Sequence, residues 1–523
     1  MNSKAFVLMI AMVGLLVVAA PTVADDWQSI ACIPADPSPE EMFDVTQAVD
    51  GFEAEPLKWE ALHGGQNAKA ALRRDPTEHH GGATALRIDY EFTGRQELEY
   101  LQINTKLDIR EPGLGLGFWA KTDGTPFHFR LRVLDRSGKT LQLDMLSANR
   151  AGWQFVAVLL SHPNLAWGGD GNRRIDYPCR LAGICIDRPH VGFSACGSLW
   201  LDDVALLRPH KPAPSRLTVE VRPKRFGNLY AVGEPVAIRV RGGEGCVIDW
   251  SFTDFWGRQL ARGQDVASHT EARFTPQRAG FFNGTIELLG PGGPLEKQIF
   301  AFAALPGGGE TARSDFLGMC AHFGQRSYPR GAEESDLAGE VNRTAARVAQ
   351  AGASQKAWIT EIGWPTHRMS TGSDEHAQAC HAVRALVMLQ STGIVEKVFW
   401  YDFKDDGLNR DYNEDNFGVV HNQLYNCAPK PAAVALAVFL RLTHGAPCGP
   451  LWQEGNAYAM PYRLPDGQQR LVAWAMAPGT PVHVSGALAD VRDLMGNPCG
   501  RGGPHLLGPE PIYLTGKDLH LGR

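Results

Sequence analysis

Three features that mark common protein classes are lacking in this 523-residue chain. No block of Lys and Arg stands out and the formal net charge is −6, so nothing points to nucleic acid or to an anionic membrane as a partner. The ten cysteines include no Cys-x-x-Cys pair, which argues against a zinc site. After residue 24, no apolar run is long enough to span a bilayer. We therefore expect a soluble protein with a neutral partner.

The first residues have the pattern of a secretory signal peptide. Lys4 precedes an apolar run over 5–20, and Thr22-Val23-Ala24 forms a small-x-small cleavage pattern. A membrane anchor is the alternative, but the run is short for the ~20 residues that a span requires. We expect 1–24 to be removed and the mature protein to be secreted, periplasmic or extracellular.

All ten cysteines follow the predicted cleavage site, which suits an oxidising compartment. Cys179, Cys185 and Cys196 are close enough in the sequence for one disulfide bridge. The alternative is that most of the cysteines are small buried apolar residues. The spacing leaves both open.

The length and the turn-rich composition predict several domains with much β structure. Short alternating segments over 43–208 and again over 216–289 are typical of antiparallel β-sandwiches. Between 315 and 446 strand and helix patterns alternate, which indicates parallel strands. The expected order is a jelly roll at 25–208, an immunoglobulin-like sandwich at 215–305, an incomplete (β/α) barrel-like domain at 312–446 and a small β-sandwich at 449–523.

The segment 25–208 resembles the jelly-roll carbohydrate-binding modules of secreted glycosidases. The resemblance rests on Asp50-Gly51-Phe52-Glu53, on the segment 82–90 and on Leu199-Trp200-Leu201-Asp202-Asp203-Val204. It implies a structural calcium ion held by Glu53 and Asp203, with a solvated acidic turn as the alternative. No cofactor is required otherwise.

Four tryptophans of this segment could stack on sugar rings, because a pyranose offers an apolar face to an aromatic ring. For each of them a place in the core is the alternative. They are Trp59, Trp119, Trp153 and Trp167.

The segment Thr360-Glu361-Ile362-Gly363-Trp364-Pro365 is the most specific motif. A short apolar strand ends in a carboxylate, and Gly, Trp and Pro then stop the strand, so Glu361 is expected at a strand mouth. The motif resembles the nucleophile strand of clan A glycoside hydrolases, the retaining (β/α)8 glycosidases. Further matches are 316–323 for a first strand and 399–403 for an eighth strand.

That resemblance implies an enzyme that acts on a polysaccharide or oligosaccharide. Glu361 would be the nucleophile, and the sugar would be bound by His322, Trp364, Trp400, Tyr401 and Asp402. The alternative for Glu361 is a salt bridge at the end of its strand.

Much of such an enzyme is missing. The family takes its acid/base from an Asn-Glu pair that ends the fourth strand, and no strand here ends that way. Asn413-Glu414 lies in a polar loop, where chance explains it better. A full barrel rarely has fewer than about 200 residues, whereas this segment has about 130. We therefore expect an internal deletion that joins a first βα unit to the last two.

Three functions compete at this point. The first is a secreted glycosidase in which Asp402, Asp405 or Asp406 replaces the missing acid. The second is a carbohydrate-binding protein that carries an inactive remnant of a glycosidase. The third is a structural surface protein whose sandwiches mediate contacts.

Overall fold

The structure is a computed structural model that describes residues 27–522. The predicted signal peptide lies outside this range. The gaps within it are 36–37, 64–66, 97, 147, 149, 162, 171, 190–192, 212–214, 243–244, 267–269, 307–316, 320–335, 351–355, 444–446 and 501–504.

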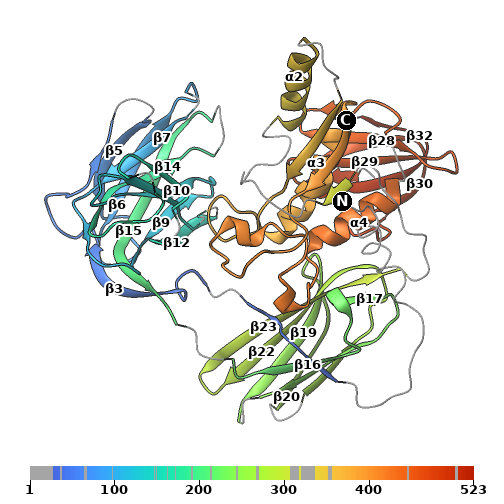
Figure 1. The fold of residues 1–523 in the computed structure, drawn as a ribbon, viewed down its shortest axis with the longest axis horizontal. Helices are drawn as coiled ribbons and strands as arrows, with labels where there is room; N and C mark the ends of the chain where they lie inside the picture. Colours follow the sequence, from blue (N-terminus) through green and yellow to red (C-terminus); the bar gives the residue numbers. More distant parts are fainter. Residues whose placement is uncertain are drawn as a thin grey trace. The chain divides into compact units, whose positions relative to one another are not determined.

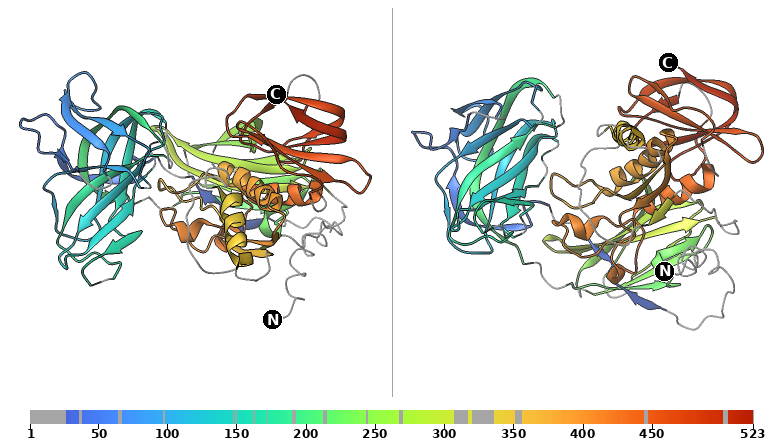
Figure 2. Two further views of the ribbon diagram at one scale, coloured as in Figure 1. Left: turned by 90° about the horizontal axis from the view of Figure 1, so that it is seen from above. Right: turned by 45° about the horizontal axis from the view of Figure 1, so that its top comes forward.

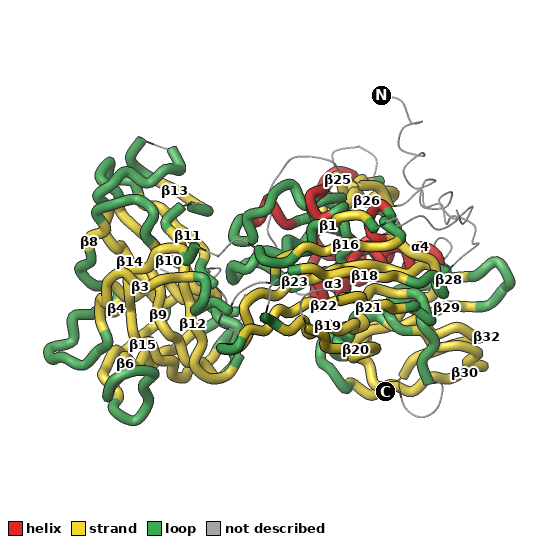
Figure 3. Tube along the Cα trace, turned by 90° about the horizontal axis from the view of Figure 1, so that it is seen from below, coloured by secondary structure: helices red, strands yellow, loops and turns green. Residues whose placement is uncertain are grey.

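The chain divides into two compact units. Unit 1 contains Met1–Ala35, Pro214–Thr366 and Ser373–Arg523, and unit 2 contains Asp36–Ala213 and His367–Gly372. The described chain is mostly β-sheet, and its α-helices all belong to unit 1 (Figure 3). Within the described ranges, no helix combines the length and apolar character that crossing a bilayer requires.

Unit 2 is a β-sandwich of two antiparallel sheets (Figure 1). Alternate side chains point inward, such as Phe129 and Leu131, and they form one buried core between the sheets. The seven-stranded sheet contains β4 (Glu60–Ala61), β7 (Tyr100–Asn104), β8 (Asp108–Ile109), β10 (His128–Leu134), β11 (Thr140–Asp144), β13 (Leu165–Trp167) and β14 (Cys179–Asp187). The six-stranded sheet contains β3 (Phe43–Asp50), β5 (Lys69–Asp75), β6 (Ala85–Phe92), β9 (Gly115–Asp123), β12 (Ala151–Leu159) and β15 (Ala195–Pro209).

A short segment from later in the chain, His367–Gly372, also belongs to unit 2. Met369 is buried in a small apolar cluster with Leu146 and Phe155, and Ser370 N donates to Met145 O at 2.8 Å. This segment directly follows Trp364-Pro365-Thr366, so the chain passes from unit 1 into unit 2 just after the motif and returns at Ser373.

The first sandwich of unit 1 packs a four-stranded sheet on a six-stranded sheet around its own core. The sheets are β1 (Gln28–Ile30), β16 (Thr218–Arg222), β18 (Val236–Arg241) and β21 (Thr270–Phe274), and β2 (Ile33–Pro34), β17 (Leu229–Ala231), β19 (Val247–Asp254), β20 (Gln259–Val266), β22 (Gly280–Gly290) and β23 (Gly293–Leu305). The 3-10 turn η1 spans Phe226–Asn228.

The N-terminal strands differ from the expected division of the chain. The sequence predicts one domain over 25–208, but β1 pairs with β16 and β2 pairs with β23 in unit 1. Pairing there buries Ile30, Cys32 and Ile33, each only 8% exposed. Burial of these apolar side chains stabilises the N-terminal segment on the second sandwich instead of the first.

The α/β segment of unit 1 contains three parallel strands in the order β24 (Leu317–Met319), β26 (Val395–Trp400), β25 (Ala357–Ile362). The helices are α2 (Leu337–Gln350), α3 (Glu375–Ser391) and α4 (Pro431–Thr443), and the 3-10 turns are η2 (Asn413–Asn416) and η3 (Gln423–Tyr425). Asp374 caps α3 by accepting from Ala377 N. No closed barrel is found among the described residues.

A C-terminal antiparallel sheet packs against α3 and α4 (Figures 1 and 2). Its strands are β27 (Trp452–Glu454), β28 (Ala457–Arg463), β29 (Gln469–Ala475), β30 (Thr480–Arg492), β31 (His505–Leu507) and β32 (Ile512–Gly522). Tyr458, Trp474 and Tyr513 from one face share a core with the helices, while Ala459 and Leu471 from the other face belong to a separate cluster.

The nine described cysteines are all free. Cys179 and Cys185 are buried and Cys196 is exposed, so none of these three forms the bridge that the sequence allowed. Burial raises the pKa of the Cys179 thiol to about 12, which keeps it protonated and unreactive at neutral pH.

Candidate functional site

The Glu361 carboxyl group lies near the carboxyl end of β25. Thr360 and Glu361 fall at an irregularity in the pairing of β25 with β26, where the register shifts between Ile359 and Ile362. Such a bulge re-aims a side chain at the end of a strand. Glu361 Oε1 is shielded from solvent and has no hydrogen-bond partner among the described residues. Burial accordingly raises the pKa of Glu361.

The glycine of the motif allows two strand ends to meet. A Cβ atom on Gly363 would lie 1.7 Å from the carbonyl oxygen of Tyr401, so only glycine fits. Tyr401 N donates to Ile362 O at 2.8 Å and continues the β25–β26 pairing beyond the strands. Glu361 and Tyr401 are thereby held at neighbouring strand mouths.

Glu414 is the second carboxyl group at this place. Tyr401 Oη donates to Glu414 Oε2 at 3.2 Å. Burial raises the pKa of Glu414, and the negative charge of Glu361 raises it further, while the hydrogen bond from Tyr401 opposes the shift. The two glutamates are therefore close enough for one to influence the proton affinity of the other.

Asp402 adds a third carboxyl group with a shifted pKa. Burial raises the pKa of Asp402 to about 6, although Phe403 N–H donates to its carboxylate. The negative charge of Asp406 adds to the shift. At neutral pH a group of this pKa exchanges its proton readily, which general acid–base chemistry requires.

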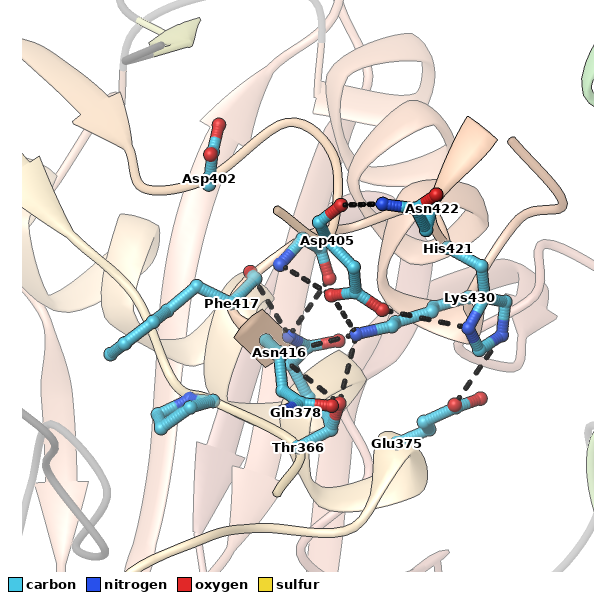
Figure 4. A network of polar contacts seen from close by, with 12 residues as sticks. Thr366, Glu375, Gln378, Asp402, Asp405, Asn416, Phe417, His421, Asn422 and Lys430 are labelled. Carbon is cyan, nitrogen blue, oxygen red and sulfur yellow. Dashed lines mark hydrogen bonds and ion pairs between the residues drawn. The ribbon is translucent and has the colours of Figure 1, made fainter. Parts of the chain in front are cut away.

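Asp405 has a structural role instead. In Figure 4 its carboxylate lies at the centre of a buried network, outside which Asp402 lies. Lys430, 0% exposed, donates from Nζ to Asp405 Oδ1 at 2.6 Å and to Thr366 Oγ1 at 2.8 Å. Burial alone would raise the pKa of Asp405, but Lys430 and His421 hold it below its usual value. An aspartate that stays ionised in an ion pair is no proton donor, so the sequence-based candidate Asp405 is set aside.

The two motif tryptophans are core residues. Trp364 is 1% and Trp400 is 0% exposed, and their ring centroids lie 5.7 Å apart. A ring covered on both faces cannot stack on a sugar, which differs from the substrate-binding role expected from the sequence. His322 lies outside the described residues. Tyr401 is also buried, but its hydroxyl reaches Glu414.

Glu53 and Asp203, the predicted calcium ligands, both contact the segment 80–83 of unit 2. Glu53 Oε1 accepts from Ala83 N at 2.7 Å, and Asp203 Oδ2 contacts His80 Nδ1 at 2.8 Å. These contacts already engage both carboxylates, and the hydrogen bond from Ala83 helps to lower the pKa of Glu53. Among the described residues, no cluster of three or more His, Cys, Asp or Glu side chains could hold a metal ion. The calcium site stays a prediction.

The outward face of the seven-stranded sheet is polar and aromatic. Arg132 of β10 lies between two rings, with its guanidinium carbon 4.8 Å from the ring centroid of Tyr100 and 5.5 Å from that of Trp167. Trp167 is 43% exposed. Of the other predicted sugar-stacking residues, Trp59 is buried in the core, and Trp119 stacks on His80.

Glu414, Arg132 and Tyr100 are the residues that sequence reasoning missed. The pair Asn413-Glu414 was visible, but its approach to Glu361 depends on how the loop after β26 folds back. Arg132 could have been found from the alternation over 127–133, where every second residue is polar and shares one sheet face.

No family model and no curated protein matches this chain. Solved structures similar to it include a family 39 glycoside hydrolase from the gut symbiont Bacteroides cellulosilyticus WH2, with 14% identity, 55% of this chain and 98% of that chain covered, and a TM-score of 0.41. A family 11 carbohydrate-binding module of a Clostridium thermocellum cellulosomal cellulase has 16% identity, 33% and 99% coverage, and a TM-score of 0.25. A mannan-recognising carbohydrate-binding module has 13% identity, 32% and 99% coverage, and a TM-score of 0.21. These neighbours are glycoside hydrolases and carbohydrate-binding modules at low identity, and none of them defines a family for this chain.

Proposed function

We propose that this chain is an exported polysaccharide-binding protein of glycosidase ancestry, and that unit 2 binds the glycan on the outward face of its seven-stranded sheet. The observation that carries the proposal is the exposed Trp167 ring beside Arg132 and Tyr100. An aromatic ring packs on the apolar face of a sugar, while guanidinium and amide groups bind its hydroxyls. Export rests on the signal-like pattern over 1–24.

Glycosidase ancestry rests on the Glu361 motif together with the three parallel strands. In this proposal the α/β segment is a shortened (β/α) domain. Its strands β24, β25 and β26 follow one another in the chain and form one parallel sheet in the order β24-β26-β25, so the chain between them is too short for the other strands of a barrel. Three parallel strands cannot close into a barrel. Glycan binding by unit 2 does not depend on that closure.

The test is binding of the full chain to a panel of polysaccharides by affinity electrophoresis and calorimetry. Trp167→Ala should weaken binding roughly tenfold or more, because a stacked aromatic ring is lost. Trp358→Ala is the matched control, since Trp358 is also exposed and also has a cation, Lys397, over its ring, but belongs to unit 1. Equal binding by both variants and the unsubstituted protein would contradict the proposal.

Hydrolysis by Glu361 is the second candidate function. The charge of Glu361 raises the pKa of Glu414, and this favours hydrolysis because retaining enzymes use a pair of neighbouring carboxyl groups. Glu361 would attack the anomeric carbon, and Glu414 or Asp402 would protonate the leaving oxygen. Tyr401 would position Glu414 through its 3.2 Å hydrogen bond.

Trapping with a mechanism-based fluoroglycoside tests this candidate. A retaining enzyme forms a covalent adduct on Glu361 that is detected by mass spectrometry of the intact protein. Glu361→Gln should abolish the adduct, and Glu396→Gln, an exposed glutamate of β26, should leave it unchanged. Absence of any adduct would leave glycan binding as the function.

A further inference from the structure

The sheet register places the side chains that surround Arg132. On β10, His128, Arg130 and Arg132 alternate with the core residues Phe129 and Leu131, so the three polar side chains share the outward face. In the ladder, Arg132 lies opposite Gln142 of β11 on one side and opposite Gly183 of β14 on the other.

Gly183 lets a side chain from a third strand reach Arg132. A Cβ atom on Gly183 would lie 2.5 Å from Gln102 Nε2, so any other residue would displace Gln102 of β7. Gln102 Nε2 donates to Ala182 O at 2.9 Å, which turns its carbonyl oxygen toward Arg132. Arg132 Nη1 donates to that oxygen at 3.0 Å.

All hydrogen-bond partners of Arg132 among the described residues are neutral. They are Gln142 Oε1 at 2.9 Å, Gln102 Oε1 at 3.0 Å and Tyr100 Oη at 3.3 Å. Its Nη2 donates to none of the described residues. The guanidinium is therefore fixed in orientation while its positive charge lacks a directly bonded counter-ion.

The acidic groups nearby are already engaged. Asp187 forms an ion pair with Arg130, the adjacent arginine of the same face. Asp144, which lies opposite Arg130, accepts from Thr371 Oγ1 at 2.9 Å. Asp187 thus forms its ion pair with Arg130, while the charge of Arg132 acts on Asp187 from beyond ion-pair distance.

An unpaired guanidinium fixed between two rings suits an anionic ligand. Guanidinium presents its N–H groups in a planar fork that matches the oxygens of carboxylate and sulfate groups, and charge-assisted hydrogen bonds are stronger than neutral ones. The exposed Trp167 ring beside it offers a stacking surface for the sugar that carries the anion.

We propose that Arg132, held by Gln102, Gln142, Tyr100 and Trp167, binds the acidic group of a charged polysaccharide, a uronate carboxylate or a sulfate ester. This inference rests on the proposed function, glycan binding by unit 2, and names the class of glycan. Arg132 acts as the residue that distinguishes acidic from neutral chains.

The test uses the full chain and pairs of glycans that differ only in charge. Polygalacturonate is compared with its methyl ester, and dextran sulfate with dextran, by calorimetry at low salt. The protein should bind the acidic member of at least one pair roughly 10- to 100-fold more tightly than the neutral member. The pair that shows the difference identifies carboxylate or sulfate as the group recognised.

Two variants separate charge recognition from general sugar contact. Arg132→Gln should remove most of the preference and leave the affinity for the neutral member unchanged. Arg73→Gln changes the net charge equally on β5 of the other sheet, where the Arg73 side chain is 59% exposed, and should keep the preference. Circular dichroism and thermal melting verify that both variants are folded.

Each result decides between the two proposals. Equal affinity of the unsubstituted protein for acidic and neutral members would overturn the role of Arg132 and retain glycan binding by unit 2. If Arg132→Gln lowers the affinity for the acidic and the neutral member by the same factor, the role of Arg132 in recognising charge is also overturned, and glycan binding by unit 2 is retained. Binding to no member of either pair or of the wider panel would contradict the proposed function and this inference together.

Discussion

In unit 2 the guanidinium of Arg132 is hydrogen-bonded to neutral acceptors, whereas in unit 1 the charge of Glu361 raises the pKa of Glu414 and no cation bonds to either glutamate in the described part of the chain. The first charge is fixed by cross-strand side chains on a continuous sheet. The two glutamates of unit 1 come from the end of β25 and from η2, in the loop that follows β26. The sheet face thus fixes the orientation of a charged group, while the strand mouth raises the pKa of a carboxyl group.

Two buried lysines, one in each unit, differ in the number of carboxylates around them. Lys139 of unit 2 lies near three carboxylates, of which Asp170 and Asp176 are partly exposed. Lys430 of unit 1 has one carboxylate within ion-pair distance in the described structure, that of the buried Asp405. If one carboxylate near Lys139 is removed, two others remain, whereas the described residues offer Lys430 no second carboxylate within ion-pair distance.

The largest expected effect follows from that difference. Asp405→Asn leaves Lys430 buried without a counter-ion and should lower the free energy of unfolding by about 3–5 kcal/mol. Asp170→Asn is the matched change in unit 2 and should lower it much less, because Asp135 and Asp176 remain beside Lys139. Denaturant unfolding of both variants measures the two losses. Similar losses would show that the number of carboxylates around a buried lysine does not govern its stability here.

The pH dependence of stability should also report on the strand mouth. The pKa of Asp402 is raised to about 6 from 3.8, so the folded state holds the proton more tightly than the unfolded state. Stability from this group is therefore highest below pH 4 and is lost as the pH rises from 4 to 6, by up to about 3 kcal/mol. Asp402→Asn should flatten that part of the curve, measured by chemical unfolding at pH 4 to 7. An unchanged slope would mean that Asp402 titrates normally.

Removing the partly buried charge of Glu361 should stabilise the protein slightly. Glu361→Gln replaces a carboxylate whose Oε1 has no partner in the described structure by a neutral amide, and it also relieves the repulsion of Glu414. We expect a gain of about 0.5–1 kcal/mol at pH 7, the sign that is typical of functional groups held at a cost in stability. Glu396→Gln, an exposed change in β26, is the control with no expected gain. Destabilisation by Glu361→Gln would argue for a structural ion pair.

The smallest effect on stability is expected on the sheet face. Trp167→Ala removes a side chain that is 43% exposed, so the free energy of unfolding should change by about 0.5 kcal/mol or less. Trp400→Ala, by contrast, empties a fully buried site and should lower it by about 3–5 kcal/mol. Thermal unfolding distinguishes the two. A large loss in Trp167→Ala would identify this residue as structural and weaken its assignment to glycan binding.

Much of the secondary structure could be predicted from the sequence. The short alternating segments over 43–208 predicted strands such as β10, and the alternation of strand and helix patterns between 315 and 446 predicted parallel strands with helices such as α3. The strand that ends at Glu361 was predicted from an apolar run stopped by Gly-Trp-Pro. These patterns are local, because the period of a strand or helix and the residues that end it lie within a few positions.

Pairing between distant segments could not be predicted in the same way. No local pattern predicts that β1 and β2 pair with strands of the second sandwich, or that Met369 packs in unit 2. Whether Trp400 faces solvent or the core depends on α3, α4 and the C-terminal sheet, which cover it. Such contacts join residues that are far apart in the chain and that have no shared local pattern.

The type and order of the main elements, and the carboxylate at the end of β25, follow from local sequence patterns, because propensity, periodicity and strand-breaking residues act over a few positions. The surroundings of each charge depend on tertiary packing. Asp405 became an ion-pair partner because Lys430 is buried beside it, Glu414 became a neighbour of Glu361 through Tyr401, and Arg132 is held by residues of three other strands, Gln142, Gln102 and Trp167. The chemistry of a charged side chain depends on its counter-ions and its solvent, and both are set by packing.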